Sequence, residues 1–161
     1  MTPASLSHLV LIPSYNPGSR VIDTVLAARR QWNPVWIVVD GSTDDSPRQL
    51  QAMATTDDGL HVIVLPENRG KGAAVLEGIA RAVAAGYTHA LTMDSDGQHP
   101  ADLIPAFMEV SQAHPEAMVL GKPVFAADAP ALRVNGRKVS NGWANLETLW
   151  MGIGDSLYGF R

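Results

Sequence analysis

Short apolar segments that alternate with helical ones are the feature that most constrains how this chain can fold. Runs rich in Val, Ile and Leu occupy residues 8–12, 35–39, 60–65, 89–93 and 116–120. The second run, VWIVV, is apolar at every position, which is typical of a central parallel strand covered on both of its faces. We therefore interpret the runs as five strands.

The segments between these strands have the apolar spacing of helices. Such spacing is found at 20–31, 73–85 and 103–111, and a weaker, polar helix is expected at 47–53. In the third helix, the face expected to be buried consists of Val75, Leu76, Ile79 and Val83. Strands and helices that alternate along the chain predict an α/β fold, with a Rossmann-like, mostly parallel sheet and helices on both faces.

The segment Leu91–Pro100 (LTMDSDGQHP) changes from apolar to acidic where its strand ends. Side chains two residues apart in an extended segment point the same way, so Asp94 and Asp96 can face one point. Two carboxylates suit Mg²⁺ or Mn²⁺, with the neutral oxygen of Gln98 as an additional ligand. Taken alone, two acids in this spacing more often form a solvated acidic turn, and it is the rest of the chain that favours a metal site. His99 could be a further ligand, or simply stand where a helix starts.

Two other strand ends carry charged side chains. Asp40 follows the second strand and could accept hydrogen bonds from a nucleobase or ribose, or could stabilise a turn. Arg69 and Lys71 lie among glycines just before a helix, a setting that suits a diphosphate, although a solvated basic loop looks the same. Because ligands of open α/β sheets bind at the carboxyl ends of the strands, these groups together indicate a site for a nucleoside diphosphate.

The overall composition argues against several classes of binding partner and cofactor site. A net charge of −4 without a basic run argues against nucleic acid, and a chain without cysteine has no disulfide or thiolate metal site. The first residues do not resemble a signal peptide, and no apolar run approaches the roughly 20 residues of a membrane-spanning helix. We expect a cytoplasmic protein with a single domain over residues 1–161. Since domains seldom end on a mixed string such as DSLYGFR, we expect the natural chain to continue.

The pattern is looser after Gly121. Residues 122–140 read as a loop with positive charge, and 141–153 as an amphipathic helix. Arg133 and Arg137 could bind a phosphate or form a solvated face. Asp155 is an acid in a polar setting near the end of the given sequence, and it is therefore a weak candidate for a catalytic base.

Five strings carry a resemblance to a known family. They are LIPSYNP (11–17), VVDGSTDDS (38–46), ENRGKGAAVLEGI (67–79), MDSDGQHPADL (93–103) and DSLYGFR (155–161). Through these strings, which follow one another in the family's order, the chain resembles the family-2 glycosyltransferases with the GT-A fold. Within that family it is most similar to the dolichyl-phosphate mannosyltransferase-like branch.

The resemblance implies a metal-dependent, inverting transfer of a sugar from a UDP- or GDP-sugar to an acceptor. The nucleotide-sugar site would consist of Pro13, Tyr15, Asp40, Arg69, Lys71, Asp94 and Ser95. A Mg²⁺ or Mn²⁺ ion held by Asp94, Asp96 and Gln98 would act as a Lewis acid on the diphosphate. The implied catalytic residues are Asp155, Arg133 and Arg137, with the two arginines binding an acceptor phosphate.

Some positions depart from the family pattern. Val39 replaces the first of two acids that the family often has, and Lys122 stands where an arginine is frequent. The Glu-Asp base motif of polysaccharide-forming members is absent. Because a phosphate acceptor is already ionised, this absence favours a polyprenyl phosphate over a saccharide hydroxyl. Such an acceptor implies peripheral contact with the inner face of the cell membrane and a role in cell-envelope glycan or glycolipid synthesis.

Two alternatives remain open from the sequence. A nucleotidyltransferase that makes nucleotide sugars shares this type of sheet, but it would want a Gly- and Arg/Lys-rich loop where SYNPGSR stands. A non-catalytic nucleotide-binding module is the other. The sugar, the base and the oligomeric state do not follow from the sequence.

Overall fold

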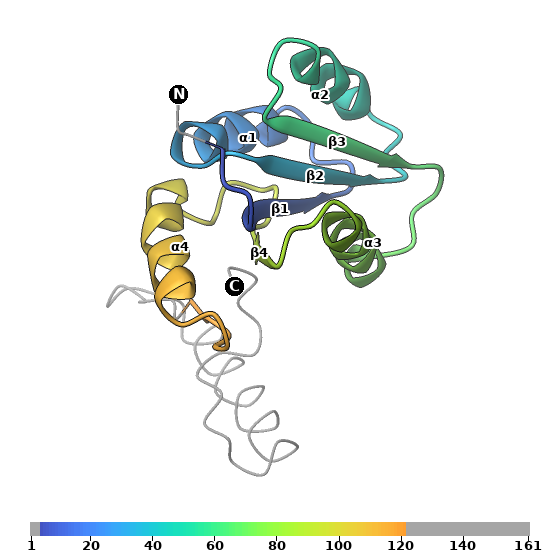
Figure 1. Ribbon diagram of the computed structural model, residues 1–161. Helices are drawn as coiled ribbons and strands as arrows, with labels where there is room; N and C mark the ends of the chain where they lie inside the picture. Colours follow the sequence, from blue (N-terminus) through green and yellow to red (C-terminus); the bar gives the residue numbers. More distant parts are fainter. Residues whose placement is uncertain (1–3, 122–161) are drawn as a thin grey trace, which may run out of the picture.

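The computed structural model describes residues 4–121, which form a parallel β-sheet with helices on both faces (Figure 1). The strands are β1 (His8–Ser14), β2 (Val35–Asp40), β3 (Leu60–Leu65) and β4 (His89–Thr92). The helices are α1 (Arg20–Gln31), α2 (Ser46–Ala54), α3 (Lys71–Ala84) and α4 (Ile104–Ala113), with a short 3-10 helix η1 (Ala101–Leu103) before α4. These elements confirm the first four predicted strands and the four predicted helices. The loop and helix predicted within 122–153 lie outside the described residues.

The order of the strands determines where loops diverge at the sheet edge. The four strands lie in the order β3-β2-β1-β4, and each neighbouring pair is parallel. The chain therefore runs outward from β1 to β3 and then crosses back to place β4 on the other side of β1. The carboxyl ends of β1 and β4 form the switch point at which ligands bind in open α/β sheets.

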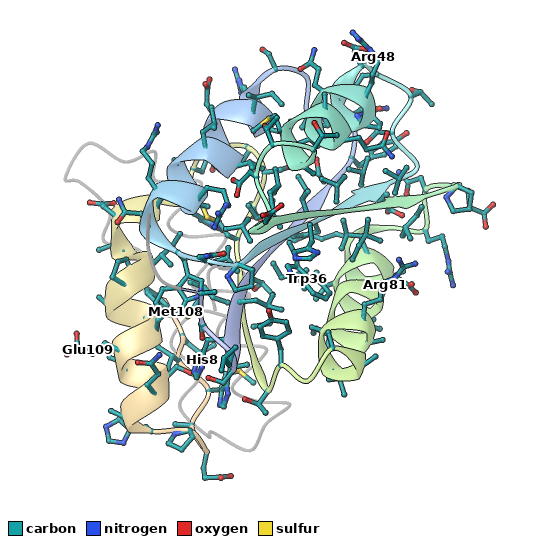
Figure 2. The ribbon with its side chains drawn as sticks, turned by 45° about the horizontal axis from the view of Figure 1, so that its top comes forward. His8, Trp36, Arg48, Arg81, Met108 and Glu109 are labelled. Atoms are coloured by element: carbon teal, nitrogen blue, oxygen red, sulfur yellow. The ribbon has the colours of Figure 1, made fainter. Side chains whose placement is uncertain are left out.

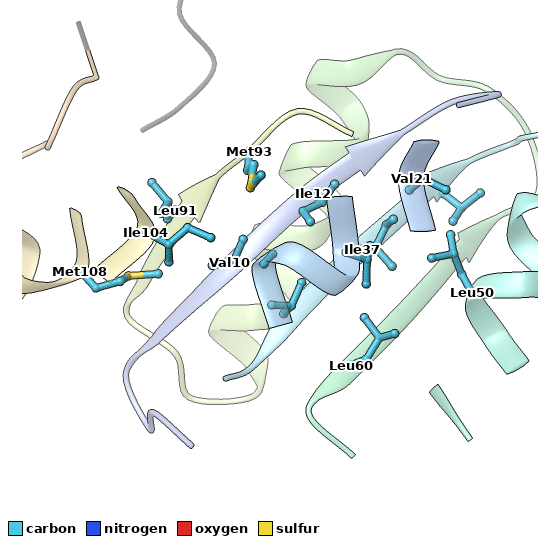
Figure 3. Packing of buried hydrophobic residues seen from close by; sticks show 14 residues of the cluster. Val10, Ile12, Val21, Ile37, Leu50, Leu60, Leu91, Met93, Ile104 and Met108 are labelled. Atoms are coloured by element: carbon cyan, nitrogen blue, oxygen red, sulfur yellow. The ribbon is translucent and has the colours of Figure 1, made fainter. Parts of the chain in front are cut away.

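Both faces of the central strands β1 and β2 are buried, as their apolar sequences predict. On one face, Val10 and Ile12 of β1 pack with residues of α1, α2 and α4 (Figure 3). On the other face, Leu9 and Leu11 pack with Trp36 and residues of α3. Since side chains alternate along a strand, β1 supplies both layers of the core and is buried at every position.

The buried face of α3 differs from the prediction. Its large apolar residues point outward, with Leu76 68%, Ile79 37% and Val83 65% exposed, while Val75 is only partly buried. The residues that face the sheet are Ala74, Gly78 and Ala82. A Cβ on Gly78 would lie 2.6 Å from Leu11 Cδ1, so the helix can approach the sheet this closely only through small side chains. The prediction ranked residues by hydrophobicity and missed this requirement.

The predicted fifth strand is also wrong. Residues 116–120 form no strand, and Met118 is 76% exposed. Met118 and Leu120, which would lie on one face of such a strand, are both exposed, so the segment lacks the buried face that the prediction assumed. Nor do residues 4–121 include a helix long and apolar enough to cross a membrane.

Two histidine rings stack on each other at the amino ends of β1 and β4. His8 and His89 are paired in register, and their rings stack with centroids 4.2 Å apart and planes 3° apart. His8 Nε2 lies 3.2 Å from Ser111 Oγ of α4, and His89 Nε2 lies 3.1 Å from the Pro115 carbonyl oxygen. Figure 2 shows His8 at this end of the sheet, beside α4. Burial lowers the pKa of His8, and the neighbouring His89 lowers it further.

We expect the free energy of unfolding to decrease as the pH falls from about 7 to about 5. The folded-state pKa of His8 lies below the unfolded value of about 6.5, so the unfolded chain binds the proton more readily. This contribution to stability is therefore present above about pH 6.5 and is lost as the pH falls toward the folded-state pKa. Urea unfolding at a series of pH values measures the slope.

The variant His8→Gln should reduce this pH dependence, whereas His114→Gln, at an exposed position, should leave it unchanged. A slope that is the same in His8→Gln and in the wild type would contradict the assignment to His8.

Candidate functional site

A cleft of about 360 Å³ lies at the carboxyl edge of the sheet, above the ends of β1, β2 and β4. The loop after β1, the end of β2, the start of α3 and the acidic segment after β4 all contribute to its wall. The lining residues are Pro13, Ser14, Tyr15, Asp40, Asn68, Gly70, Lys71, Ala74, Asp94, Ser95 and Asp96. The sequence predicted a ligand at the carboxyl edge of the sheet, and the strand order places the cleft at the switch point of that edge.

Asp40 fastens the loop that precedes α3. Its carboxylate is buried, and Oδ1 accepts a hydrogen bond from the Arg69 N–H at 2.9 Å while Oδ2 accepts one from the Gly70 N–H at 2.8 Å. Hydrogen bonds to a charged acceptor are among the stronger ones in proteins. The side chain therefore holds the loop in place at the end of β2, and its role as a base or ribose ligand stays a prediction.

Gly41 lets the same loop lie directly on the end of β2. Its φ of +63° is in the left-handed region, and a Cβ at this position would overlap the backbone of Glu67 and Asn68. Glycine is the residue that fits both conditions. The pair Asp40 and Gly41 thus determines where the start of α3, and with it Lys71, can lie.

Asn16 and Asp44 connect the loops after β1 and β2. Asn16 has a φ of 43°, and its Oδ1 accepts hydrogen bonds from the Thr43 N–H at 2.8 Å and from the Asp44 N–H at 3.3 Å. Asp44 Oδ2 accepts one from the Gly18 N–H at 2.9 Å. Although burial alone would raise it, hydrogen bonds from Ser46 and Gly18 lower the pKa of the Asp44 carboxyl. The sequence prediction did not include these two residues, although Asn and Asp among Gly, Ser and Pro are a recognised signal for such turns.

Lys71 and Asp94 meet across the cleft. Lys71 Nζ lies 2.5 Å from Asp94 Oδ1, so an ammonium group neutralises the first acid of the predicted metal pair. Asp96 lines the same cleft, and its Oδ1 accepts a hydrogen bond from the Gln98 N–H at 2.9 Å. The Gln98 side chain is exposed and does not belong to the cleft wall.

Asp94 and Asp96 can be compared with the set of ligands that a divalent metal ion requires. Within residues 4–121, no three His, Asp or Glu side chains are close enough to hold a metal ion by themselves. Mg²⁺ commonly takes only one or two protein carboxylates and completes its shell with water and substrate phosphates. Asp94 and Asp96 fit this type of open site.

The segment that carries the two acids is held from both sides. The ring of His99 is buried, and its Nδ1 accepts a hydrogen bond from the Asp94 N–H at 2.9 Å. Thr24 of α1 donates a hydrogen bond to the Ser95 carbonyl oxygen at 3.2 Å. Burial lowers the pKa of His99, while Asp94 and Asp96 act in the opposite direction. The sequence prediction had left His99 as a ligand or a helix-start residue, and it had not considered Thr24.

The structure brings most of the predicted nucleotide-sugar residues together. Six of them line the cleft, namely Pro13, Tyr15, Asp40, Lys71, Asp94 and Ser95. Arg69 contributes its backbone N–H to Asp40 and is not part of the cleft wall. The predicted catalytic residues Arg133, Arg137 and Asp155 lie outside the described residues. Ser14 was not predicted; the residue lines the cleft, and its buried hydroxyl has no hydrogen-bond partner within residues 4–121.

The match to a known protein family covers nearly the whole chain. The model of a family described as glycosyl transferase family 2 matches residues 9–155. The undecaprenyl-phosphate 4-deoxy-4-formamido-L-arabinose transferase of Klebsiella pneumoniae (strain 342) is 32% identical over 111 residues, covering 62% of this chain and 32% of the relative. The polyprenol monophosphomannose synthase of Mycolicibacterium smegmatis is 28% identical over 159 residues, covering 95% of this chain and 60% of the relative. The chain therefore spans between about a third and three fifths of these relatives.

Comparison with solved structures supports the same fold. The crystal structure of S. aureus TarS 1-349 aligns with a TM-score of 0.53 and 21% sequence identity, covering 75% of this chain and 39% of that chain. At this level of identity the likeness concerns the fold alone, and it confirms the predicted α/β fold of the GT-A type.

Proposed function

The chain belongs to glycosyl transferase family 2, in its dolichyl-phosphate mannosyltransferase-like branch, and on that premise we propose that it transfers a sugar from a nucleoside-diphosphate sugar to an acceptor phosphate. The observation that carries the proposal is the meeting of Lys71, Asp94 and Asp96 in one cleft at the switch point of the sheet. The family match favours this transfer over a nucleotidyltransferase or a non-catalytic nucleotide-binding module.

The donor would bind along the cleft from the loop after β1 to the acidic segment after β4. Pro13, Ser14 and Tyr15 offer a polar and aromatic wall for the nucleoside. Lys71 supplies a cation at the N-terminus of α3, a position that favours a diphosphate. On donor binding the ammonium group would exchange its contact with Asp94 for one with a phosphate oxygen.

A Mg²⁺ or Mn²⁺ ion held by Asp94 and Asp96, with Gln98 as a further oxygen ligand, would stabilise the negative charge of the leaving diphosphate when bound. We propose direct displacement with inversion. An acceptor phosphate oxygen forms the new bond to the anomeric carbon, and the nucleoside diphosphate departs from the opposite side with the electron pair of the broken bond.

We infer the chemical class of the acceptor from whether its attacking oxygen needs a catalytic base. A phosphate oxygen is already ionised, whereas a sugar hydroxyl is a poor nucleophile until a base removes its proton. In this proposal Arg133 and Arg137 bind the acceptor phosphate, and the acceptor is a polyprenyl phosphate at the inner face of the cell membrane. The names of two relatives support this class, a polyprenol monophosphomannose synthase and an undecaprenyl-phosphate transferase.

A transfer assay on the natural full-length protein tests the proposal. With a panel of labelled UDP- and GDP-sugars and Mn²⁺, we expect transfer to polyprenyl phosphate and none to simple sugars. Arg133→Ala should reduce the rate at limiting acceptor by about 10- to 100-fold, because a charge-assisted hydrogen bond contributes about 1.5–3 kcal/mol.

Arg30→Ala, which removes an exposed arginine of α1, serves as the control and should leave the rate unchanged. Efficient transfer to a sugar hydroxyl that does not depend on Arg133 would contradict the proposed acceptor and make Asp155 the residue to examine as a base.

A further inference from the structure

The contact between His99 and Asp94 determines the protonation of the ring. The backbone N–H of Asp94 can only donate, so His99 Nδ1, 2.9 Å away, must be the acceptor. A neutral imidazole that accepts at Nδ1 carries its proton on Nε2. The buried ring is therefore held in a single tautomer by the backbone of the first acid of the pair.

The other side of the same ring faces the Asp94 carboxylate. His99 Nε2 lies 3.8 Å from Asp94 Oδ2, while Lys71 Nζ lies 2.5 Å from Oδ1. At 3.8 Å the ring N–H is too far for a hydrogen bond but close enough to attract the oxygen. One ring thus hydrogen-bonds the backbone of Asp94 and lies near its carboxylate, and the ring itself is buried.

From this geometry we propose that His99 is a positioning residue, which fixes the backbone and the carboxylate orientation of Asp94 so that a divalent ion can bind with the donor. The inference rests on the proposed function, since it assigns His99 a role toward the ion of that same site. A group that orients a metal ligand through hydrogen bonds typically changes metal affinity by about 10- to 100-fold when it is removed.

Three substitutions separate the two contacts of the ring. His99→Asn keeps an acceptor near the Nδ1 position and should preserve the hydrogen bond from the Asp94 N–H. His99→Gln reaches the Nε2 position but cannot accept at Nδ1, and His99→Leu removes both contacts while keeping an apolar side chain in a buried place. If the backbone contact is the important one, Mn²⁺ affinity should decrease in the order wild type, Asn, Gln, Leu.

The measurement is Mn²⁺ binding to the full chain, followed by the loss of the free-ion signal in electron paramagnetic resonance. The titration contains UDP or GDP, whichever raises the melting temperature of the wild type more. We expect His99→Leu to weaken Mn²⁺ binding by about 10-fold or more and His99→Asn to restore most of it. Nucleotide binding without Mn²⁺ should be the same in all variants, a result that general unfolding would not give.

Thr24→Val is the matched control, because it removes the partly buried hydrogen bond to the carbonyl oxygen of Ser95, the residue that follows Asp94. If this control weakened Mn²⁺ binding as much as His99→Leu, general rigidity of the segment would be the cause and the inference would be overturned. Equal Mn²⁺ binding by the wild type and His99→Leu would overturn the role of His99 and leave the proposed metal site standing. A wild type that binds no Mn²⁺ with either nucleotide would overturn the proposed metal site as well.

Discussion

Replacing Asp94 or Asp96 with asparagine should reduce Mn²⁺-dependent donor binding by about 100-fold or more, because each change would remove one of the two carboxylates of the proposed metal site. The fold should be nearly unaffected. Neither side chain is buried, and the contact that Asp94 makes with Lys71 is a partly exposed ion pair, which contributes at most about 1 kcal/mol. Calorimetric titration of the nucleotide with and without Mn²⁺, together with a melting curve, measures both effects.

Asp102→Asn provides the control for this experiment, since Asp102 is an exposed acid of η1 that is not part of the cleft wall. It should bind the donor as the wild type does. Donor binding that depends on Mn²⁺ equally in the wild type and in both asparagine variants would rule out the site.

The second large effect is expected at Asp40. Asp40→Ala removes two hydrogen bonds from backbone N–H groups to a buried carboxylate, those of Arg69 and Gly70. We expect the free energy of unfolding to decrease by about 3 kcal/mol, and affinity for the nucleoside diphosphate to fall with it as the loop before α3 loses its anchor. Urea unfolding and calorimetric titration with UDP or GDP measure the two quantities.

Asp40→Asn is the isosteric comparison. Its amide keeps one acceptor but places an NH₂ group against the other N–H, so its effect should lie between those of the wild type and the alanine variant. Unchanged stability in Asp40→Ala would contradict the anchoring role. If only ligands that carry a sugar lost affinity, Asp40 would belong to a different part of the site.

The strands and the position of the site could be predicted because both depend on local patterns. An apolar run such as 35–39 identifies a buried strand, and polar residues that follow successive strands must lie at one edge of a parallel sheet. The acids Asp40, Asp94 and Asp96 therefore came together in the cleft as expected.

Other features could not be predicted because they depend on contacts between distant segments. The partners of Asp40 are 29 and 30 residues away, and those of Asn16 are 27 and 28 residues away. Hydrophobicity alone also gave the wrong face of α3, because the choice of Gly78 depends on the distance between that helix and Leu11. The hydrogen bond between His99 and Asp94 spans only five residues, but the pattern of the sequence does not show that the ring is buried.

The close packing of α3 links the back of the sheet to the cleft mechanically. Lys71 stands at the first residue of α3, and Gly78 lies two turns further on against β1 and β2. A helix of this length, roughly 21 Å, moves as a stiff rod, so lifting it at Gly78 also displaces its first turn. A side chain added on the far side of the sheet would therefore move the ammonium group that contacts Asp94, although nothing in the cleft had been replaced. A larger residue at position 78 would therefore raise α3 above the sheet, and the Lys71 side chain would have to reach a different distance to contact Asp94.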